Sequence, residues 1–288
     1  MADTLEPEHH QGESPGVDYQ PWGIEGTRLQ FRGPPVAFDA PFVAVLGGTE
    51  TYGKYVDAPY PKLLAEWVNM PVANLGIHQA GLTLFAEERC LLETASRANV
   101  CVLQLLGAQN MSNRLYSVHA RRNDRFLGVS PALRDLYPNV DFAEVNFTGH
   151  LLSTLSNVPN AFEAVVDELK WAWVQRMRRI VQLIETDVIL LWVSDRHPDA
   201  TKHECHEGEP TFVDHKMIDM LRDDVWDVVE VVRPGMHRDV DGMVFSLGEI
   251  GAAESLPCPA DHARIAEALG TCILEKLSGS AASKRARA

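Results

Sequence analysis

Five short apolar runs recur along the chain and constrain its fold more than any other feature of the sequence. We predict that these runs are β-strands, at residues 42–46, 72–75, 100–106, 188–193 and 228–232. Segments with helical spacing of apolar residues lie between them, and a last one follows at 261–277. Strands that alternate with helices predict a parallel sheet with helices on both faces. We therefore expect an α/β fold with three layers, α/β/α, and a five-stranded parallel sheet in a flavodoxin-like order.

The chain of 288 residues is long enough for one large core, and we expect a single α/β domain over residues 19–277. Residues 1–18 are polar and hold no apolar pattern, which predicts a disordered lead-in. Residues 111–154 are rich in arginine and lack periodicity, which is typical of a functional insertion after a central strand. Residues 278–288 are small and basic, and we expect a frayed tail there.

Charge and cysteine content limit the partners and the compartment. The formal net charge of −14 argues against nucleic-acid binding, because a phosphate backbone would be repelled. We expect no membrane span, since the chain has no run of about 18 apolar residues. The N-terminus lacks the apolar core of a secretory signal, and the five cysteines have no framework spacing. These features predict a cytoplasmic protein with reduced thiols, and a homo-oligomer is left open.

Residues able to carry chemistry follow three successive predicted strands. The first strand stops at Gly47-Gly48, with the hydroxyl of Thr49 just beyond it. The second ends at Gly76, and Asn110 follows the third. Open α/β sheets bind their ligands at the carboxyl ends of the strands. We therefore expect Thr49, Gly76 and Asn110 to line one pocket.

These segments resemble the sequence blocks of the SGNH (GDSL-type) hydrolases. Residues 47–53, Gly-Gly-Thr-Glu-Thr-Tyr-Gly, match the first block, Gly-Asp-Ser-x-Thr-x-Gly, at three positions. Gly76 resembles the glycine of the second block, and Gly-Ala-Gln-Asn at 107–110 approximates Gly-x-Asn with one extra residue. His262, just inside the last predicted helix, is similar in placement to the family's histidine. The resemblance covers about residues 41–110 and 257–275.

A second resemblance covers residues 41–150. This part of the chain is similar to an uncharacterised bacterial family that shares Gly-Gly-Thr-Glu-Thr-Tyr-Gly and Gly-Ala-Gln-Asn-Met-Ser-Asn. No activity comes with that second resemblance.

The SGNH resemblance implies a hydrolase or acyltransferase without a cofactor or a bound metal. Its substrate would be an ester or an acylated sugar, with anionic sugars included. Thr49 would be the nucleophile and His262 the base, and the oxyanion would be held by the Thr49 and Gly76 amides with the Asn110 side chain. Threonine replaces the family's serine, and the position of its acid holds Pro259. Asp261 is the adjacent candidate acid, although neighbours at a helix start rarely face each other.

Other roles for these residues stay open. Asn110 could cap a strand and His262 could cap a helix. The competing class is a binding protein on the same scaffold without catalysis, in which the arginines hold an anionic ligand. Residues 48–54 also fit Gly-x4-Gly-Lys, a loop that holds phosphate, so a transferase with a phosphate or sulfate donor is a further alternative. Tyr55 stands there where such a loop needs serine or threonine.

The arginine-rich segment and one histidine-rich loop are the remaining candidate sites. Guanidinium groups suit an anionic substrate, and the candidates are His119, Arg121, Arg122 and Arg125. Ion pairs with carboxylates of the same insertion, at Asp124, Asp135, Asp141 and Glu144, are the alternative. The loop and its flank hold a metal-like cluster of His197, His203, Cys205, His206 and His215, whose spacing matches no standard zinc module. His197, within Asp-Arg-His-Pro, is the second choice for the base, and His237 is the third.

Overall fold

The computed structural model of the chain describes residues 16–119, 121–200, 208–233 and 239–285. Its centre is a parallel sheet in the order β4-β3-β5-β8-β9. The strands are β3 (Val43–Gly47), β4 (Val72–Gly76), β5 (Val100–Gln104), β8 (Val188–Ser194) and β9 (Asp227–Val232). In chain order this is 2-1-3-4-5, so the predicted flavodoxin-like sheet of five parallel strands is confirmed.

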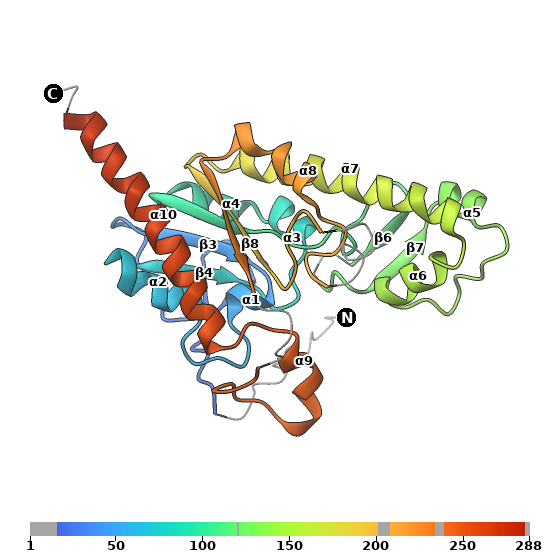
Figure 1. Cartoon of the computed structure of the whole chain (residues 1–288), viewed down its shortest axis with the longest axis horizontal. Helices are drawn as coiled ribbons and strands as arrows, with labels where there is room; N and C mark the ends of the chain where they lie inside the picture. The colour runs from blue at the N-terminus through green and yellow to red at the C-terminus, as the bar shows by residue number, and fades with distance from the viewer. Residues whose placement is uncertain (1–15, 120, 201–207, 234–238, 286–288) are drawn as a thin grey trace, which may run out of the picture.

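Helices cover both faces of the sheet (Figure 1). On one face α2 (Tyr60–Val68) packs against α10 (Pro259–Arg285). On the other, α7 (Pro159–Leu183) packs against α3 (Leu82–Glu87) and α4 (Arg89–Ser96). The pleat of β3 explains why its run is continuously apolar. Val43 and Val45 join the core under α2 and α10, while Ala44 and Leu46 join the core on the opposite face.

The arginine-rich insertion forms small elements of its own at one end of α7 (Figure 1). It contains the antiparallel pair β6 (Tyr116–Val118) and β7 (Phe126–Val129), followed by α5 (Pro131–Leu136) and α6 (Thr148–Leu155). The other short elements are β1 (Trp22–Gly23), β2 (Gln30–Phe31), α1 (Thr49–Tyr52), α8 (His215–Asp219), η2 (Arg222–Asp224), η3 (Leu247–Glu249) and α9 (Ile250–Glu254).

Three expectations about local structure need correction or lie outside the described part. The helix predicted over 82–97 is divided at Glu88, whose backbone leaves the helical region with φ −82° and ψ 85°. The tail expected to fray from residue 278 continues α10 as far as Arg285. The predicted lead-in lies outside the described residues as far as residue 15. Across the residues described, no helix combines the length and apolar character needed to span a membrane.

Candidate functional site

The turn after β3 is a single helical turn, α1, packed tightly against its neighbours. Gly47 has no room for a side chain, because a Cβ would lie 1.9 Å from Thr51 Oγ1 and 2.4 Å from Gln104 Oε1. The amide of Gly48 donates a hydrogen bond to Gln104 Oε1 at 3.0 Å. The glycines therefore allow the chain to turn directly against the end of β5, and this places Thr49 at the edge of the sheet.

Gln104, the last residue of β5, holds this turn together. Its Oε1 also accepts a hydrogen bond from Thr51 Oγ1 at 2.6 Å, and its Nε2 donates to Glu50 Oε2 at 2.9 Å. Thr51 gives its only proton to Gln104, so the Tyr60 hydroxyl, 2.7 Å away, donates to Thr51 Oγ1. Burial raises the pKa of Tyr60 well above its usual range, which keeps this hydroxyl protonated.

Thr49 forms a pair with a histidine from the neighbouring strand end. Its Oγ1 lies 3.1 Å from Nδ1 of His78, which follows β4, and accepts a hydrogen bond from the Gln79 amide at 3.0 Å. The hydroxyl can donate its own proton to Nδ1 when His78 carries its ring proton on Nε2. Burial, and then the nearby charge of Lys54, lower the pKa of His78 to about 4, although Glu249 opposes the shift. The imidazole is therefore neutral near pH 7 and able to accept a proton.

A pocket of about 240 Å³ opens beside Thr49 at the carboxyl ends of β3, β5 and β8. Its lining is about half polar and half apolar. The polar side chains that line it are Thr49, Glu50, Gln79, Gln104, Gln109, Asn110, Asn123, Asp124 and Glu209. Apolar surface comes from Ala80, Leu105, Leu106, Val193, Pro210 and Leu256. Such a mixture of amides, carboxylates and apolar walls suits a polar organic ligand.

His262 does not take part in this arrangement. Its side chain is buried, with 1% of the residue exposed, and its Nδ1 accepts a hydrogen bond from the Tyr60 amide at 3.0 Å. The ring also stacks on the Tyr60 ring, with centroids 5.8 Å apart. Burial, followed by the charge of Arg32, lowers the pKa of His262 to about 3. The structure thus shows the alternative role, capping the first turn of α2, and the hydroxyl of Thr49 is bonded to His78 instead of the predicted base.

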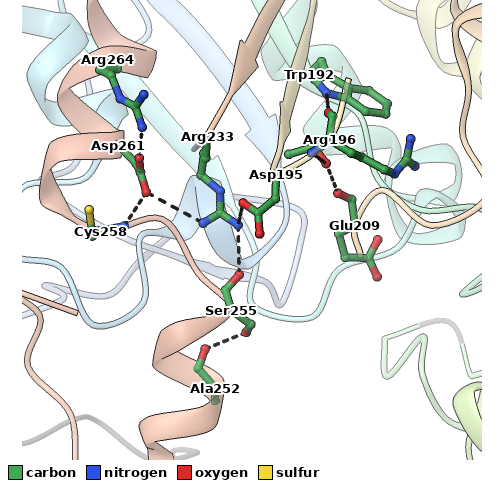
Figure 2. Close-up of polar contacts among 11 residues, drawn as sticks. Trp192, Asp195, Arg196, Glu209, Arg233, Ala252, Ser255, Cys258, Asp261 and Arg264 are labelled. Atoms are coloured by element: carbon green, nitrogen blue, oxygen red, sulfur yellow. Dashed lines mark hydrogen bonds and ion pairs between the residues drawn. The ribbon is translucent and has the colours of Figure 1, made fainter. Parts of the chain in front are cut away.

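Asp261, the predicted acid, belongs to a cluster of charges at the start of α10 (Figure 2). Its carboxylate accepts a hydrogen bond from the Cys258 amide at 3.2 Å and pairs with Arg264. Arg233 lies 3.9 Å from the same carboxylate and 2.7 Å from Asp195. These contacts fix the N-terminal turn of α10 to the end of β9. They do not orient a catalytic imidazole.

The two predicted oxyanion residues have different surroundings. The Gly76 amide donates to the Asn74 side chain at 3.0 Å, so it is occupied, and Gly76 does not line the pocket. Asn110 does line the pocket, and its Oδ1 accepts a hydrogen bond from Thr148. That bond orients the Asn110 amide and leaves its NH₂ group to serve as a donor. Thr49 and Asn110 therefore share a pocket as predicted, whereas the prediction for Gly76 is wrong.

The arginines of the insertion do not reach the pocket. Arg121 lies 3.6 Å from Glu88, and Arg122 and Arg125 are exposed. His119 is also exposed, and its Nδ1 accepts hydrogen bonds from the amides of Arg121 and Arg122, both at 3.1 Å. None of these four side chains lines the pocket. The expectation that they bind an anionic substrate there is therefore wrong.

The segment contributes Asn123 and Asp124 to the pocket instead. Both lie in the turn between β6 and β7, which points these shorter side chains towards the sheet. A carboxylate and an amide thus stand where the sequence predicted guanidinium groups.

The glycine turn is not a free phosphate-binding loop. Its Gly48 amide is bonded to Gln104, and the Gly53 amide donates to the Thr49 carbonyl at 3.0 Å. Lys54 lies 3.5 Å from Glu249 and 4.6 Å from the centre of the Tyr55 ring. The lysine that would meet a phosphate is therefore already paired with a carboxylate. This geometry argues against the alternative of a phosphate or sulfate donor at the turn.

The histidine-rich loop falls partly outside the described residues, because His203, Cys205 and His206 lie in 201–207. His237 lies outside them too. His197, the second choice for the base, is exposed and does not line the pocket. Among the side chains that the structure describes, no group of three or more His, Cys, Asp or Glu could hold a metal ion.

Residues of the site that the sequence did not single out include His78, Gln104, Gln109 and Glu209. His78 follows the glycine that ends β4 by two positions, as Thr49 follows the glycine that ends β3. That parallel was a usable signal. Gln104 is a buried polar residue at the end of an otherwise apolar strand, which marks it as a residue with a partner.

The fold and the site together define an α/β protein with a polar pocket at the carboxyl ends of its parallel strands. Within that class, the chain belongs to the family described as a domain of unknown function (DUF6473), which it matches over residues 8–278. This agrees with the second resemblance seen in the sequence. Comparison with the curated proteins finds no match.

Similar solved structures include enzymes of the SGNH and GDSL type. A carbohydrate esterase family 2 enzyme from Corynascus thermopiles (Myceliophthora fergusii) is 14% identical, with 86% of this chain and 69% of that chain covered and a TM-score of 0.45. A protein assigned to the G-D-S-L lipolytic family, from Desulfitobacterium hafniense DCB-2, is 11% identical, with 81% and 99% covered and a TM-score of 0.43. At these identities and scores, neither an activity nor a substrate carries over to this chain.

Proposed function

We propose that this protein is a hydrolase or acyltransferase in which Thr49 is the nucleophile and His78 is the base. The observation that carries the proposal is the 3.1 Å contact between Thr49 Oγ1 and His78 Nδ1 at the edge of the pocket. A hydroxyl bonded to a neutral imidazole beside an open cavity is the minimum arrangement for nucleophilic acyl transfer. The proposed substrate is an ester or an acylated sugar small enough for that pocket.

In the proposed reaction, Thr49 Oγ1 attacks the acyl carbon while His78 Nδ1 takes its proton. The developing oxyanion would be held by the Asn110 NH₂ group and the Thr49 amide, which stands in the first turn of α1 and has no intrahelical acceptor. The bond to the leaving oxygen then breaks, and the proton on the imidazolium passes to that oxygen. Water or a second alcohol, deprotonated by His78, next attacks the acyl-threonine and releases Thr49.

The pocket also indicates which substrates the reaction excludes. Its described lining carries three carboxylates, those of Glu50, Asp124 and Glu209, and no lysine, arginine or histidine. A substrate anion would meet only negative charge there. We therefore restrict the proposal to neutral or cationic substrates, and no longer include the anionic sugar that the sequence suggested.

A second candidate function, binding without catalysis, is favoured by one feature of the site. The Gly76 amide, which an SGNH-like oxyanion hole would use, is bonded to Asn74. An imidazole with a pKa of about 4 is also a weak proton acceptor for an alcohol. A protein with this geometry could hold a polar ligand and turn it over slowly or not at all.

The test is hydrolysis of aryl acetates and acetylated sugars by the wild-type protein and its variants. Thr49→Ala and His78→Gln should each reduce kcat/KM by at least about a hundredfold, since each removes a reacting group. Thr49→Ser should keep or raise the rate, because it removes the hindering methyl group. Thr271→Ala and His150→Gln are matched controls, since both residues are exposed and neither lines the pocket.

Two results would decide against catalysis by this pair. One is the absence of turnover in both the wild-type protein and Thr49→Ser. The other is turnover that survives Thr49→Ala unchanged. Thermal unfolding of each variant shows whether a lost rate reflects a lost fold.

A further inference from the structure

One of the carboxylates that line the pocket belongs to Glu209. This residue follows β8, and its carbonyl accepts a hydrogen bond from Ser194 Oγ at 2.6 Å, which ties the loop to the strand end. Figure 2 shows the Glu209 side chain directed away from the Arg233 cluster. The carboxylate is therefore not neutralised by that cluster. It accepts hydrogen bonds from Gln109 Nε2 at 2.5 Å and from the Thr211 amide at 3.2 Å.

The surroundings of Glu209 favour a positive charge in the pocket. Crowding by protein atoms, and then the negative charge of Glu50, raise the pKa of Glu209 above its ordinary value. Glu209 is exposed as a whole residue, and it lines the pocket. Asp124 adds a third acidic group to the same lining. A cation between these carboxylates would relieve their mutual repulsion.

Gln109, which lines the same pocket, has an acceptor oxygen that lacks a hydrogen-bond donor within the described part of the chain. The residue is only 8% exposed and lines the pocket, and its Nε2 donates to Glu209. Its Oε1 is buried and has no hydrogen-bond partner among the residues that the structure describes. A buried acceptor without a donor costs on the order of 1–3 kcal/mol. A ligand that brings several N–H donors would satisfy Gln109 and Glu209 together.

We propose that Glu209 and Gln109 form the subsite for an ammonium group, so that the substrate of Thr49 is an amine-bearing polar molecule such as an amino sugar. An ammonium group supplies three donors and one positive charge, which matches a carboxylate beside an unpaired amide oxygen. A metal ion is less suited, because no group of three ligating side chains is found among the described residues. The inference rests on the proposed function for its reaction, but the binding site itself does not depend on catalysis.

Calorimetric titration with three sugars of the same ring tests the subsite. The probes are glucosamine, glucose and glucuronate, which are cationic, neutral and anionic near pH 7. Glucosamine should bind at least about tenfold more tightly than glucose, and glucuronate should be weakest, because only the first brings a charged donor to Glu209. Glu209→Gln should remove that preference, whereas Glu66→Gln, an exposed glutamate on α2, should leave it unchanged.

Gln109→Leu is the second variant, and it should weaken glucosamine by about tenfold while glucose changes little. Several binding results would overturn the inference. Equal binding of glucose and glucosamine, no binding of any sugar, or a preference that survives Glu209→Gln shows that no ammonium subsite exists. Tight binding of calcium or magnesium chloride in place of glucosamine would assign the carboxylates to a metal. Glucosamine binding without turnover of any ester would leave the subsite standing and remove the hydrolase.

Discussion

The burial of His262 predicts that acid destabilises this protein in a way that one substitution can isolate. The ring is 1% exposed, and its Nδ1 accepts the Tyr60 amide, so protonation of that nitrogen would break the bond that caps α2. Burial and the charges of Arg32 and Arg233 lower the pKa of His262 to about 3, against the partial opposition of Asp261. In the unfolded chain a histidine has a pKa of about 6.5.

The sign and size of the effect follow from proton linkage. Between about pH 6.5 and pH 3, the unfolded chain binds a proton at His262 that the folded protein does not bind. The free energy of unfolding therefore falls as the pH falls through this window, by about 1.4 kcal/mol per pH unit well below 6.5. Between about pH 7 and pH 4.5 the loss from this one residue is about 2.5 kcal/mol. This figure is nearly the same for a folded pKa of about 3 or about 4, because both lie below the lower pH.

Urea unfolding of the wild-type protein and of His262→Gln, at about pH 7 and pH 4.5, measures the effect. At the higher pH the variant should lose about 1–3 kcal/mol, because the Tyr60 amide loses its acceptor. Between about pH 7 and pH 4.5, the free energy of unfolding of His262→Gln should fall by about 2.5 kcal/mol less than that of the wild-type protein. His150→Gln, which replaces an exposed histidine, is the control. Equal losses in the wild-type protein and His262→Gln, within about 0.5 kcal/mol, would refute the assignment of a buried neutral ring.

Three other predictions follow from the site. If His78 is the base, kcat/KM should rise with pH through about 4 and then level off, and an acid limb near 6.5 would contradict its buried setting. Gln104→Leu keeps the size of the side chain but leaves the Gly48 amide and the Thr51 hydroxyl without their acceptor. Urea unfolding should therefore show a loss of about 2–4 kcal/mol, and a loss below about 1 kcal/mol would contradict this role. Gly76→Ala would place a Cβ 2.4 Å from the Tyr52 amide nitrogen, so urea unfolding should show a loss of at least about 1–3 kcal/mol. Gly149→Ala, whose Cβ would meet no described atom within 4 Å, should be neutral or stabilising by up to about 1 kcal/mol.

The strands and their order could be predicted because their signal is local. Each strand is a short apolar run closed by a polar or glycine residue, and the parallel arrangement follows from the helices between the strands. The one-turn helix α1 could not be predicted in this way. Its geometry depends on Gln104, which reaches Gly48 and Thr51 from 56 and 53 residues further along the chain. Glycines at 47 and 48 signalled a turn, but not which partner would hold it.

The insertion shows a different limit of the sequence. Its arginines suggested an anion site because of their number, but the direction of a side chain is decided by the turn that carries it. The turn between β6 and β7 presents Asn123 and Asp124 to the pocket, while Arg122 and Arg125 remain exposed. The amino-acid composition thus identified the segment that borders the site. It predicted a positive charge in the pocket, where the segment contributes the negative charge of Asp124.

The histidines show how sheet register could have corrected the assignment of the base. His262 meets Tyr60, 202 residues away in the chain, and no local pattern around it could reveal that partner. His78 could have been found, because β3 and β4 were predicted to be parallel and each ends in a glycine. The structure pairs Gly47 with Gly76, so the residues two positions further on both lie just past the same edge of the sheet. Those residues are Thr49 and His78, and their contact is what this register brings about.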